Sequence, residues 1–489
     1  MLIKLHSLDI TQIITGLCCG IIFGVASFFV SPLWVLVGLI CALCTYLIVR
    51  KPEIGLLGYL LITSTIIDEN SLPRFSIGIG RLVIPDLILF FLFGLILFKI
   101  IIFPDFKFIH SSLDLPILAF VTVALFSTFL AIQQHSVTLN QSLGEVRVIL
   151  SYLTFFIVTN LIRKKDQLNF LIKGLFLLAA VVSIGMIVQF LLGNSVQILP
   201  GRVEDVSTQN IGITRILPPG QSLIYVVLIC LIGLLIFDKG LHKSIPQILP
   251  TILVGFAVVL TFNRSFWVGI GIAVVFLLVL VGNENRKRFV LGTFLVVLLV
   301  GFIITVIQIN PATRVSKLIT AFTTRVTSLV SGDLMGEPSL QSRFIENGYA
   351  FQQMLEHPIL GLGLGSNYRP FDPRLDWENY DGRAYIHNGQ FWIILKTGFL
   401  GYACFLLFTF IFIWRGLKYW KTILDVDLKA IYLTFILAYL GIFAASTVNP
   451  VFTQANWSPI FGIMFGINES ILLINKSQSL QLQEQENSN

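Results

Sequence analysis

Arg264, Arg343 and His387 are the side chains of this sequence best suited by type to act on a ligand. A guanidinium group binds phosphate oxygens through paired hydrogen bonds and tolerates partial dehydration better than an ammonium group does. A histidine side chain can accept a proton near neutral pH. These residue types suit chemistry on a phosphate-bearing ligand, provided that the fold brings them to one side of the molecule.

Membrane-spanning helices must position these residues, because most of the chain is apolar. Of its 489 residues, 55% are hydrophobic and only 12% are charged, and the mean hydropathy is +0.86. A soluble domain usually has about twice that charged fraction. The apolar runs are continuous rather than alternating, which excludes a transmembrane β-barrel. The sequence predicts an all-α polytopic membrane protein with about 12–14 transmembrane helices and one large outer helical loop.

The apolar blocks define the expected helices and the domain organisation. They lie at 10–30, 31–49, 54–67, 82–103, 114–132, 147–162, 168–192, 219–237, 246–262, 264–281, 289–308, 388–414, 428–447 and 457–475. We expect helices 1–11 in 1–308, the large outer loop with part of the active site in 309–387, helices 12–14 in 388–475, and a disordered cytoplasmic tail in 476–489. The first block is expected to be a retained signal anchor. All six cysteines fall inside apolar blocks, so they are expected to pack rather than form disulfides or hold a metal.

Basic residues in the short loops predict the orientation. Alternate loops carry clusters such as Arg50-Lys51, Arg163-Lys164-Lys165 and Arg286-Lys287-Arg288, and these loops are predicted to be cytoplasmic, together with both termini. The inner side then has 14 Lys and 5 Arg, whereas the outer side has 2 Lys and 12 Arg. The net charge of +7 does not indicate nucleic-acid binding, because the charges must first be sorted by membrane side.

The excess of arginine on the outer side needs its own explanation, because the positive-inside rule does not distinguish arginine from lysine. We interpret it as binding of a phosphate-bearing ligand at the outer face. The alternative is that arginine anchors helix ends by reaching the lipid headgroups. Arg264 is the sharpest single case, because the blocks 246–262 and 264–281 leave almost no loop. An unpaired charge near that boundary costs on the order of a few kcal/mol, which favours a ligand or a carboxylate partner.

The outer segment 309–387 is expected to contain two helices. Residues 312–330 have one apolar face and are predicted to lie on the outer leaflet. The second helix covers about 340–356 and ends at His357-Pro358, since proline disfavours helix at the residue before it. Arg343 falls in the first turn of this helix, where backbone N–H groups also favour an anion.

Three further patterns follow this helix. Gly361-Leu-Gly-Leu-Gly365 could let backbone amides approach a phosphate, but no strand precedes it, so a turn is favoured. The stretch 368–385 mixes arginines, carboxylates and aromatic rings, which suit sugar binding and a solvated loop equally. His387-Asn388 opens the next span, where the histidine is either a proton acceptor or an interfacial polar residue.

These patterns together resemble the O-antigen ligase and polymerase superfamily of bacterial inner-membrane glycan transferases. Thr261-Phe-Asn-Arg264-Ser-Phe-Trp267 is similar to the family's arginine-bearing helix start. Arg343 followed by His357-Pro-Ile-Leu-Gly-Leu-Gly-Leu-Gly365 resembles the family's outer-loop motif, and His387-Asn388 with Gly398 and Gly401 resembles the start of its next helix. The resemblance is strongest over about 250–415.

The resemblance implies an undecaprenyl-diphosphate-linked glycan donor, a glycan or lipid-core acceptor, and no metal or other cofactor. Arg264 and Arg343 would hold the diphosphate, and His387 would act on the acceptor hydroxyl. Arg215, Arg383 and Asn388 are further candidates for diphosphate or sugar contacts. Membrane lipids and, as candidates, polysaccharide-assembly proteins are the expected partners, and a polymerase is favoured over a ligase. The expected location is the bacterial inner membrane, with the active site on the outer face.

Two other functions remain open at this point. A metal-dependent polyprenyl-phosphate-sugar glycosyltransferase would use carboxylates in outer loops, and Asp68-Glu69 is the pair to examine. A transporter or flippase of an anionic solute or lipid would place polar residues and broken helices near mid-membrane.

Overall fold

The computed structural model describes residues 32–67, 71–76, 81–193, 196–205, 214–237, 241–287, 290, 314–330, 338–376 and 382–488. The chain divides into two compact units, 1–55 and 56–489. In the first unit, α2 (Pro32–Arg50) is an apolar helix that begins with a proline and ends at an arginine. The second unit contains every candidate site residue, and all that follows concerns this unit.

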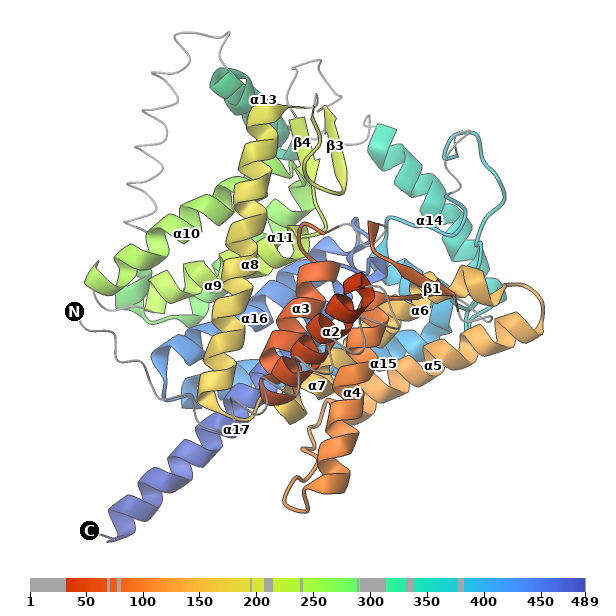
Figure 1. Cartoon of the computed structure of the whole chain (residues 1–489). Coiled ribbons are helices and arrows are strands. Elements are labelled where there is room, and N and C mark those ends of the chain that lie inside the picture. Colours follow the sequence, from red (N-terminus) through yellow and green to blue (C-terminus); the bar gives the residue numbers. More distant parts are fainter. Residues whose placement is uncertain are drawn as a thin grey trace. The chain divides into compact units, whose positions relative to one another are not determined.

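Apolar helices form most of the described chain (Figure 1). Seven of those described are long and apolar enough to cross a membrane: α4 (Ile84–Ile102), α5 (Asp114–Gln133), α6 (Leu139–Leu150) continuing into α7 (Thr154–Leu161), α8 (Lys165–Leu192), α15 (Gly389–Tyr419), α16 (Val426–Ala445) and α17 (Ser458–Ser488). Shorter apolar helices are α2, α3 (Pro52–Thr63), α9 (Gln221–Phe237), α10 (Leu241–Leu260) and α11 (Arg264–Leu280). Each corresponds to one predicted block, and the fold is that of an all-α polytopic membrane protein. The predicted blocks 10–30 and 289–308 lie outside the described residues.

The core of the second unit lies where α9, α11, α16 and α17 pack together. The residues of α9 and α16 are buried on nearly every side, because a helix that is apolar all round has no face for water. Gly269 of α11 and Gly441 of α16 let these two helices approach closely: a Cβ on Gly269 would lie 2.8 Å from the Gly441 carbonyl oxygen. Small residues at such crossings are typical of membrane helix pairs.

Some contacts between segments distant in the sequence join residues at the ends of neighbouring helices. The carbonyl of Asn456, in a loop predicted to be outer, accepts hydrogen bonds from Ser64 and Ser222, which fall within the predicted spans 54–67 and 219–237. At the loops predicted to be cytoplasmic, Lys165 pairs with Asp425 at 2.7 Å, and the Asn475 side chain bonds the chain at Thr422 and Leu424.

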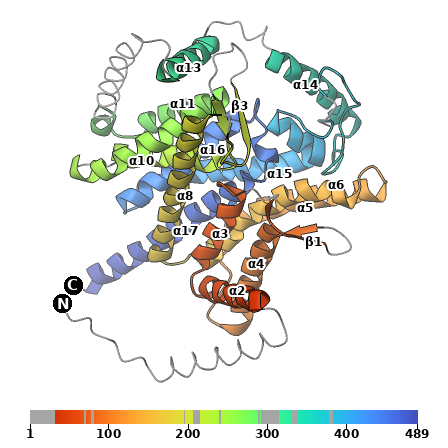
Figure 2. The same cartoon turned by 45° about the horizontal axis from the view of Figure 1, so that its top comes forward.

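Two short antiparallel hairpins were not expected from the sequence. β1 (Arg74–Ser76) pairs with β2 (Arg81–Val83), and β3 (Arg202–Asp205) pairs with β4 (Thr214–Leu217). Strands of three or four residues carry too few positions for an alternating pattern to be recognised. Figure 2 shows β3 near α11 and β1 near α6, and both hairpins belong to segments predicted to be outer.

The segment 309–387 contains the two expected helices, α13 (Arg314–Val330) and α14 (Pro338–Glu356). Their packing and their bounds differ in part from the prediction. The apolar face of α13 packs on α11, where the rings of Phe322 and Trp267 are 5.1 Å apart. α14 begins at Pro338, two residues before the predicted start, because proline is well tolerated in the first turn of a helix. Arg343 therefore lies in the second turn, away from the unpaired N–H groups of the helix start.

The tail 476–489 was predicted to be disordered, whereas the structure shows helix up to Ser488. α17 continues to Ser488 as an exposed helix. Leucine, glutamine and glutamate are good helix formers, and no glycine or proline follows Gly466 to stop the helix.

Candidate active site

A carboxylate–imidazole pair lies at the start of α15. His387 Nδ1 is 2.9 Å from both carboxylate oxygens of Glu346, and the His387 backbone N–H also donates to Glu346 Oε2 at 2.9 Å. A carboxylate only accepts hydrogen bonds, so the ring donates from Nδ1 and the neutral ring carries its lone pair on Nε2. The Glu346 side chain is 6% exposed and that of His387 is 35% exposed. The pair thus has a buried orienting group and an accessible acid–base group.

Hydrogen bonds fix the first turn of α15, directly after this histidine. Asn388 is the N-cap, and its side-chain oxygen accepts hydrogen bonds from the backbone N–H groups of Gln390 and Phe391. The Gly389 N–H donates to the Ser446 carbonyl at 2.8 Å. Asn388 was predicted to contact substrate, and the structure gives its side-chain oxygen a capping role.

Arg343 precedes Glu346 by three residues on α14, so both side chains lie on one face of that helix. Because Glu346 contacts His387, this spacing brings Arg343 to the same region as the histidine. Sequence analysis did not identify Glu346. Glu346 could have been recognised by its spacing from Arg343, because an acidic residue one helical turn after a candidate arginine lies on the same face of the helix.

Arg264 is the first residue of α11 and is half-buried. The preceding link is as tight as predicted, with Thr261 and Phe262 forming a turn in which Phe262 has a φ of 46°. The next residue, Ser265, accepts a hydrogen bond from the Asn449 side chain at 3.0 Å. The segment from Ser446 to Asn449 therefore contacts the starts of both α11 and α15, and it places Arg264 and His387 at the same end of α16.

Arg215 lies on β4 and supports the link before Arg264. Its Nε donates to the Thr261 carbonyl at 3.0 Å, and its NH1 group bonds Glu204 Oε1 at 3.2 Å. Arg215 was predicted to contact diphosphate or sugar. In this structure it ties the β3–β4 hairpin to the α10–α11 link.

The glycine run Gly361–Gly365 is a turn that fits into a break in α15. The helix is interrupted at Gly398, whose φ of 66° is outside the helical range, and this interruption leaves carbonyl groups without helical partners. The N–H groups of Leu362 and Gly363 donate to the carbonyls of Leu395 and Lys396, at 2.7 and 3.1 Å. These amides are occupied by the protein itself, so the run serves as a structural clamp rather than a phosphate loop.

A buried lysine completes this clamp. Lys396 is fully buried, and its Nζ is 2.5 Å from the Ser366 carbonyl oxygen and 3.3 Å from Glu145 Oε2. Glu145 lies on α6 and also accepts a hydrogen bond from the Gly365 N–H at 2.6 Å. A buried charge needs such partners, and here they fasten α6 and the glycine run to α15. Neither residue was identified from the sequence.

The stretch 368–385 organises itself through internal ion pairs. Arg369 bonds Asp376 through two hydrogen bonds of 2.6 and 2.8 Å, with both side chains almost fully buried. The Arg369 guanidinium holds the pKa of Asp376 well below its usual range, and the Arg374 guanidinium does the same for the pKa of Asp372. These four residues belong to the stretch 368–385, for which sugar binding and a solvated loop were equally expected, and in the structure they hold the loop together. Trp377 to Asp381 lie outside the described residues.

Arg383 closes the same loop through its backbone. Its carbonyl accepts a hydrogen bond from the Tyr368 N–H at 3.0 Å, and its side chain is half-buried, four residues before His387. The Tyr385 ring meets the His387 ring edge-on, with centroids 5.0 Å apart.

Metal-ligating side chains do not gather within the described ranges: no group of three or more His, Cys, Asp or Glu there could hold a metal ion. Asp68 and Glu69, the pair expected for a metal-dependent alternative, lie outside those ranges.

Comparison with known families decides how this arrangement is classified. Residues 249–406 match a family model described as O-antigen ligase. This match, which covers about a third of the chain, supports its assignment to the O-antigen ligase/polymerase superfamily. This confirms the resemblance inferred from the sequence motifs. Comparison with curated proteins gives no match.

The O-antigen ligase match contains the residues gathered at the starts of α11 and α15. Arg264, Arg343, Glu346 and His387 all fall within it, as does the broken helix with Lys396. The family match implies a glycosyl-transferring enzyme in a broad sense. Arg215, Glu145 and the β1–β2 hairpin lie outside the matched range.

Proposed function

We propose that this protein transfers an undecaprenyl-diphosphate-linked glycan to an acceptor hydroxyl at the outer face of a bacterial inner membrane. The observation that carries the proposal is the Glu346–His387 pair, with Nδ1 held by the carboxylate and a partly exposed ring. The family match supports glycosyl transfer as the class of reaction. Both termini are proposed to be cytoplasmic, in keeping with the distribution of lysine.

His387 is proposed as the general base. Nε2 accepts the proton of the acceptor hydroxyl while the acceptor oxygen forms a bond to the anomeric carbon of the donor. The bond from that carbon to the diphosphate oxygen breaks, and its electron pair leaves with the lipid diphosphate. Glu346 holds the ring in the required tautomer and stabilises the imidazolium that forms, as the carboxylate does in hydrolase triads.

Arg264 and Arg343 are proposed to bind the diphosphate. Negative charge develops on the leaving group, and fixed guanidinium groups stabilise it more effectively in a site that excludes water. Both residues share their end of the helices with His387, through the Ser446–Asn449 segment and through α14 respectively. Arg383 is proposed as a further diphosphate or sugar contact.

Polymerisation is the form of the reaction that we favour. A ligase requires a dedicated site for a lipid core or other specific acceptor, and nothing in the described parts of the chain suggests one. A polymerase uses a second lipid-linked glycan of the same kind as the donor.

The test is a reaction of purified protein with a lipid-linked glycan repeat, alone and with candidate acceptors. We expect a ladder of products from the wild type and a loss on the order of 10²–10⁴-fold for His387→Ala. His135→Asn is the matched control, because His135 is exposed and its φ of 59° is readily adopted by asparagine. One discrete adduct would identify a ligase, and normal ladders from His387→Ala would contradict the mechanism.

One structural feature is also typical of the transporter alternative, namely the break in α15 beside the buried Lys396. In transporters such breaks expose backbone groups to a substrate cavity. Here the freed carbonyls accept hydrogen bonds from Leu362 and Gly363, so the glycine run fills the break. The geometry therefore favours glycan transfer.

A further inference from the structure

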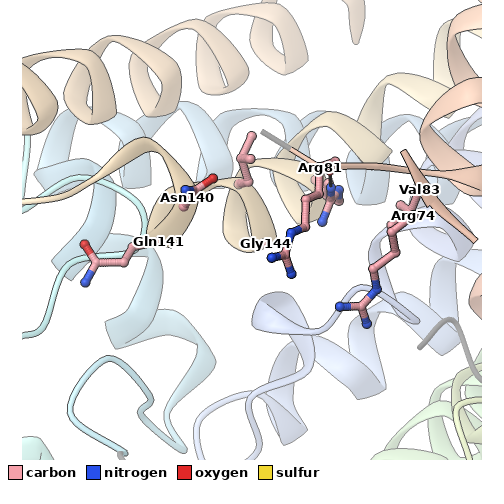
Figure 3. A pocket seen from close by; sticks show the side chains of 8 residues that line it. Arg74, Arg81, Val83, Asn140, Gln141 and Gly144 are labelled. Atoms are coloured by element: carbon pink, nitrogen blue, oxygen red, sulfur yellow. Dashed lines mark hydrogen bonds between the residues drawn. The ribbon is translucent and has the colours of Figure 1, made fainter. Parts of the chain in front are cut away.

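A separate pocket of about 570 Å³ opens between the β1–β2 hairpin and α6. Figure 3 shows Arg74 and Arg81 on the hairpin side, with Asn140, Gln141 and Gly144 along α6. Arg147 completes the polar lining. None of these residues belongs to the site at His387, and none lies in the range matched by the family model.

The lining of this pocket is cationic. Its described residues include three arginines and no aspartate or glutamate. Among the described residues, Asp86 pairs with one of these arginines: it is 14% exposed and bonds Arg147 Nε at 3.0 Å and the Val83 N–H at 3.1 Å. Arg147 also donates to the Arg81 carbonyl, so it is built into the wall that holds the hairpin. Arg74 and Arg81 are the exposed cations at the opening.

The α6 side of the pocket adds hydrogen-bond donors. Asn140 and Gln141 lie in the first turn of α6, where the helix dipole favours an anion. Gln141 Oε1 accepts hydrogen bonds from the Thr138 N–H and hydroxyl, so only its NH₂ group remains to face a ligand. Guanidinium groups and amide donors around one cavity match the oxygens of a phosphate group.

Apolar surface next to the pocket indicates that the phosphate belongs to a lipid. α4 begins directly after β2 and is only 28% buried along its apolar window. Leu87 and Phe90, one turn apart, are 41% and 54% exposed, and Phe75 on β1 is 48% exposed. The arginines thus lie at the polar end of a surface that faces the membrane interior, where a headgroup meets its chains.

We propose that this pocket binds the phosphate group of a membrane lipid, with the lipid chains lying along α4. The site is distinct from the proposed donor site and does not depend on the proposed function. Asn140, Gly144 and Arg147 follow one another at helical spacing and form the pocket face of α6. Glu145 bonds Gly365 and Lys396, so the helix that bears the lipid site is fastened to the clamp beside the active site.

The experiment compares lipid retention by the wild-type protein with that of Arg74→Gln/Arg81→Gln. Native mass spectrometry of the purified full chain would measure binding of phosphatidylglycerol, of undecaprenyl diphosphate and of inorganic pyrophosphate. We expect each arginine to contribute about fivefold to the affinity for lipid phosphate, so the double variant should bind about 25-fold more weakly. Arg202→Gln is the control, because Arg202 is an arginine of the other hairpin with a side chain 74% exposed.

The outcomes separate the sources of phosphate. Binding of either lipid that is weakened in the double variant and unchanged in Arg202→Gln supports the proposal. Inorganic pyrophosphate that binds as tightly as the lipids would overturn the assignment to a lipid. Equal lipid binding by the wild type and the double variant would overturn the site itself.

A second measurement does not depend on the variants folding. A photoactivatable phosphatidylglycerol added to the wild-type protein should form adducts on the hairpin and α4, within residues 74–102. Adducts confined to other helices would overturn the proposal.

Discussion

At the scale of single residues, the most informative contact is the one between Glu346 and His387. A histidine at a membrane boundary is usually an interfacial polar residue, and the sequence left both interpretations open. The structure adds the Glu346 carboxylate of α14, which is 6% exposed and holds Nδ1 of the histidine that precedes α15. An orienting carboxylate is costly to bury, so its presence favours an acid–base role for the ring.

Glu346→Gln tests this role, because it keeps the shape of the side chain and removes its charge. We expect kcat for glycan transfer to fall on the order of 10²–10⁴-fold with little change in donor binding, since the amide can hold Nδ1 in the wrong tautomer. Glu356→Gln is the control on the same helix, because Glu356 is exposed and bonds only Gln352 and Gln353 in the described contacts. Equal loss in both variants would contradict the assignment.

Acid should loosen the loop around Asp372 and Asp376. The arginine partners lower the pKa of both carboxyls, so protonation is harder in the folded loop than in the unfolded chain. Their contribution to stability is therefore complete above the ordinary carboxyl pKa of about 3.9 and is lost as the pH falls below it. We expect pepsin to cleave within 368–382 increasingly as the pH is lowered from 4 to 2. Asp376→Asn should move this cleavage to higher pH, and a loop already cleaved by other proteases at neutral pH would contradict the prediction.

At the scale of elements, the glycine run and the broken helix α15 form one unit. Gly361, Gly363 and Gly365 all have φ between 69° and 83°, a region that other residues adopt at a cost. A Cβ on Gly363 would lie 2.6 Å from the Ala131 Cβ, and one on Gly365 would lie 2.7 Å from the α6 backbone. These close approaches explain the glycines without any ligand.

Gly363→Ala should therefore destabilise the protein by about 2 kcal/mol or more, through backbone strain and overpacking. Thermal unfolding in detergent would measure the change. Gly348→Ala is the matched control on α14, where a Cβ meets nothing within 4 Å and alanine should be neutral or stabilising by up to about 1 kcal/mol. An unchanged unfolding temperature for Gly363→Ala would contradict the clamp.

At the scale of the whole molecule, the predicted alternation of the spans divides the loops into two sets. One set contains His387, Arg264, Arg343 and both arginine-bearing hairpins. The other contains most of the described lysines. The positive-inside rule then predicts that the lysine-rich end is cytoplasmic.

Cysteine labelling tests this orientation. In a background without the six native cysteines, Gln134→Cys should react with a membrane-impermeant maleimide on intact cells, and Lys421→Cys should not. Both positions are exposed, so access to the reagent depends on the side of the membrane. The reverse labelling pattern would overturn the proposed outer location of the site.

The sequence alone determined the class of fold and the positions of the apolar helices, and its motifs indicated the family whose model matches 249–406, because continuous apolar runs and locally spaced motifs are properties of short segments. Arg264 at a tight link and His387 at a helix start could be recognised in this way. Arg215, Arg369 and the glycine run make contacts within the protein that the sequence did not predict. The partners of Arg215 and of the glycine run lie 33 or more positions away or in a short strand, and the Arg369–Asp376 pair is local but follows no helical or strand periodicity.

Only the tertiary structure decided which polar residues meet. Glu346 and His387 are separated by 41 positions, and Glu145 and Gly365 by 220, so no local periodicity connects them. The same holds for the pocket between the β1–β2 hairpin and α6, whose arginines looked from the sequence like isolated members of the outer set. Burial of polar groups among apolar helices requires partners, and the packing of those helices determines which partners are within reach.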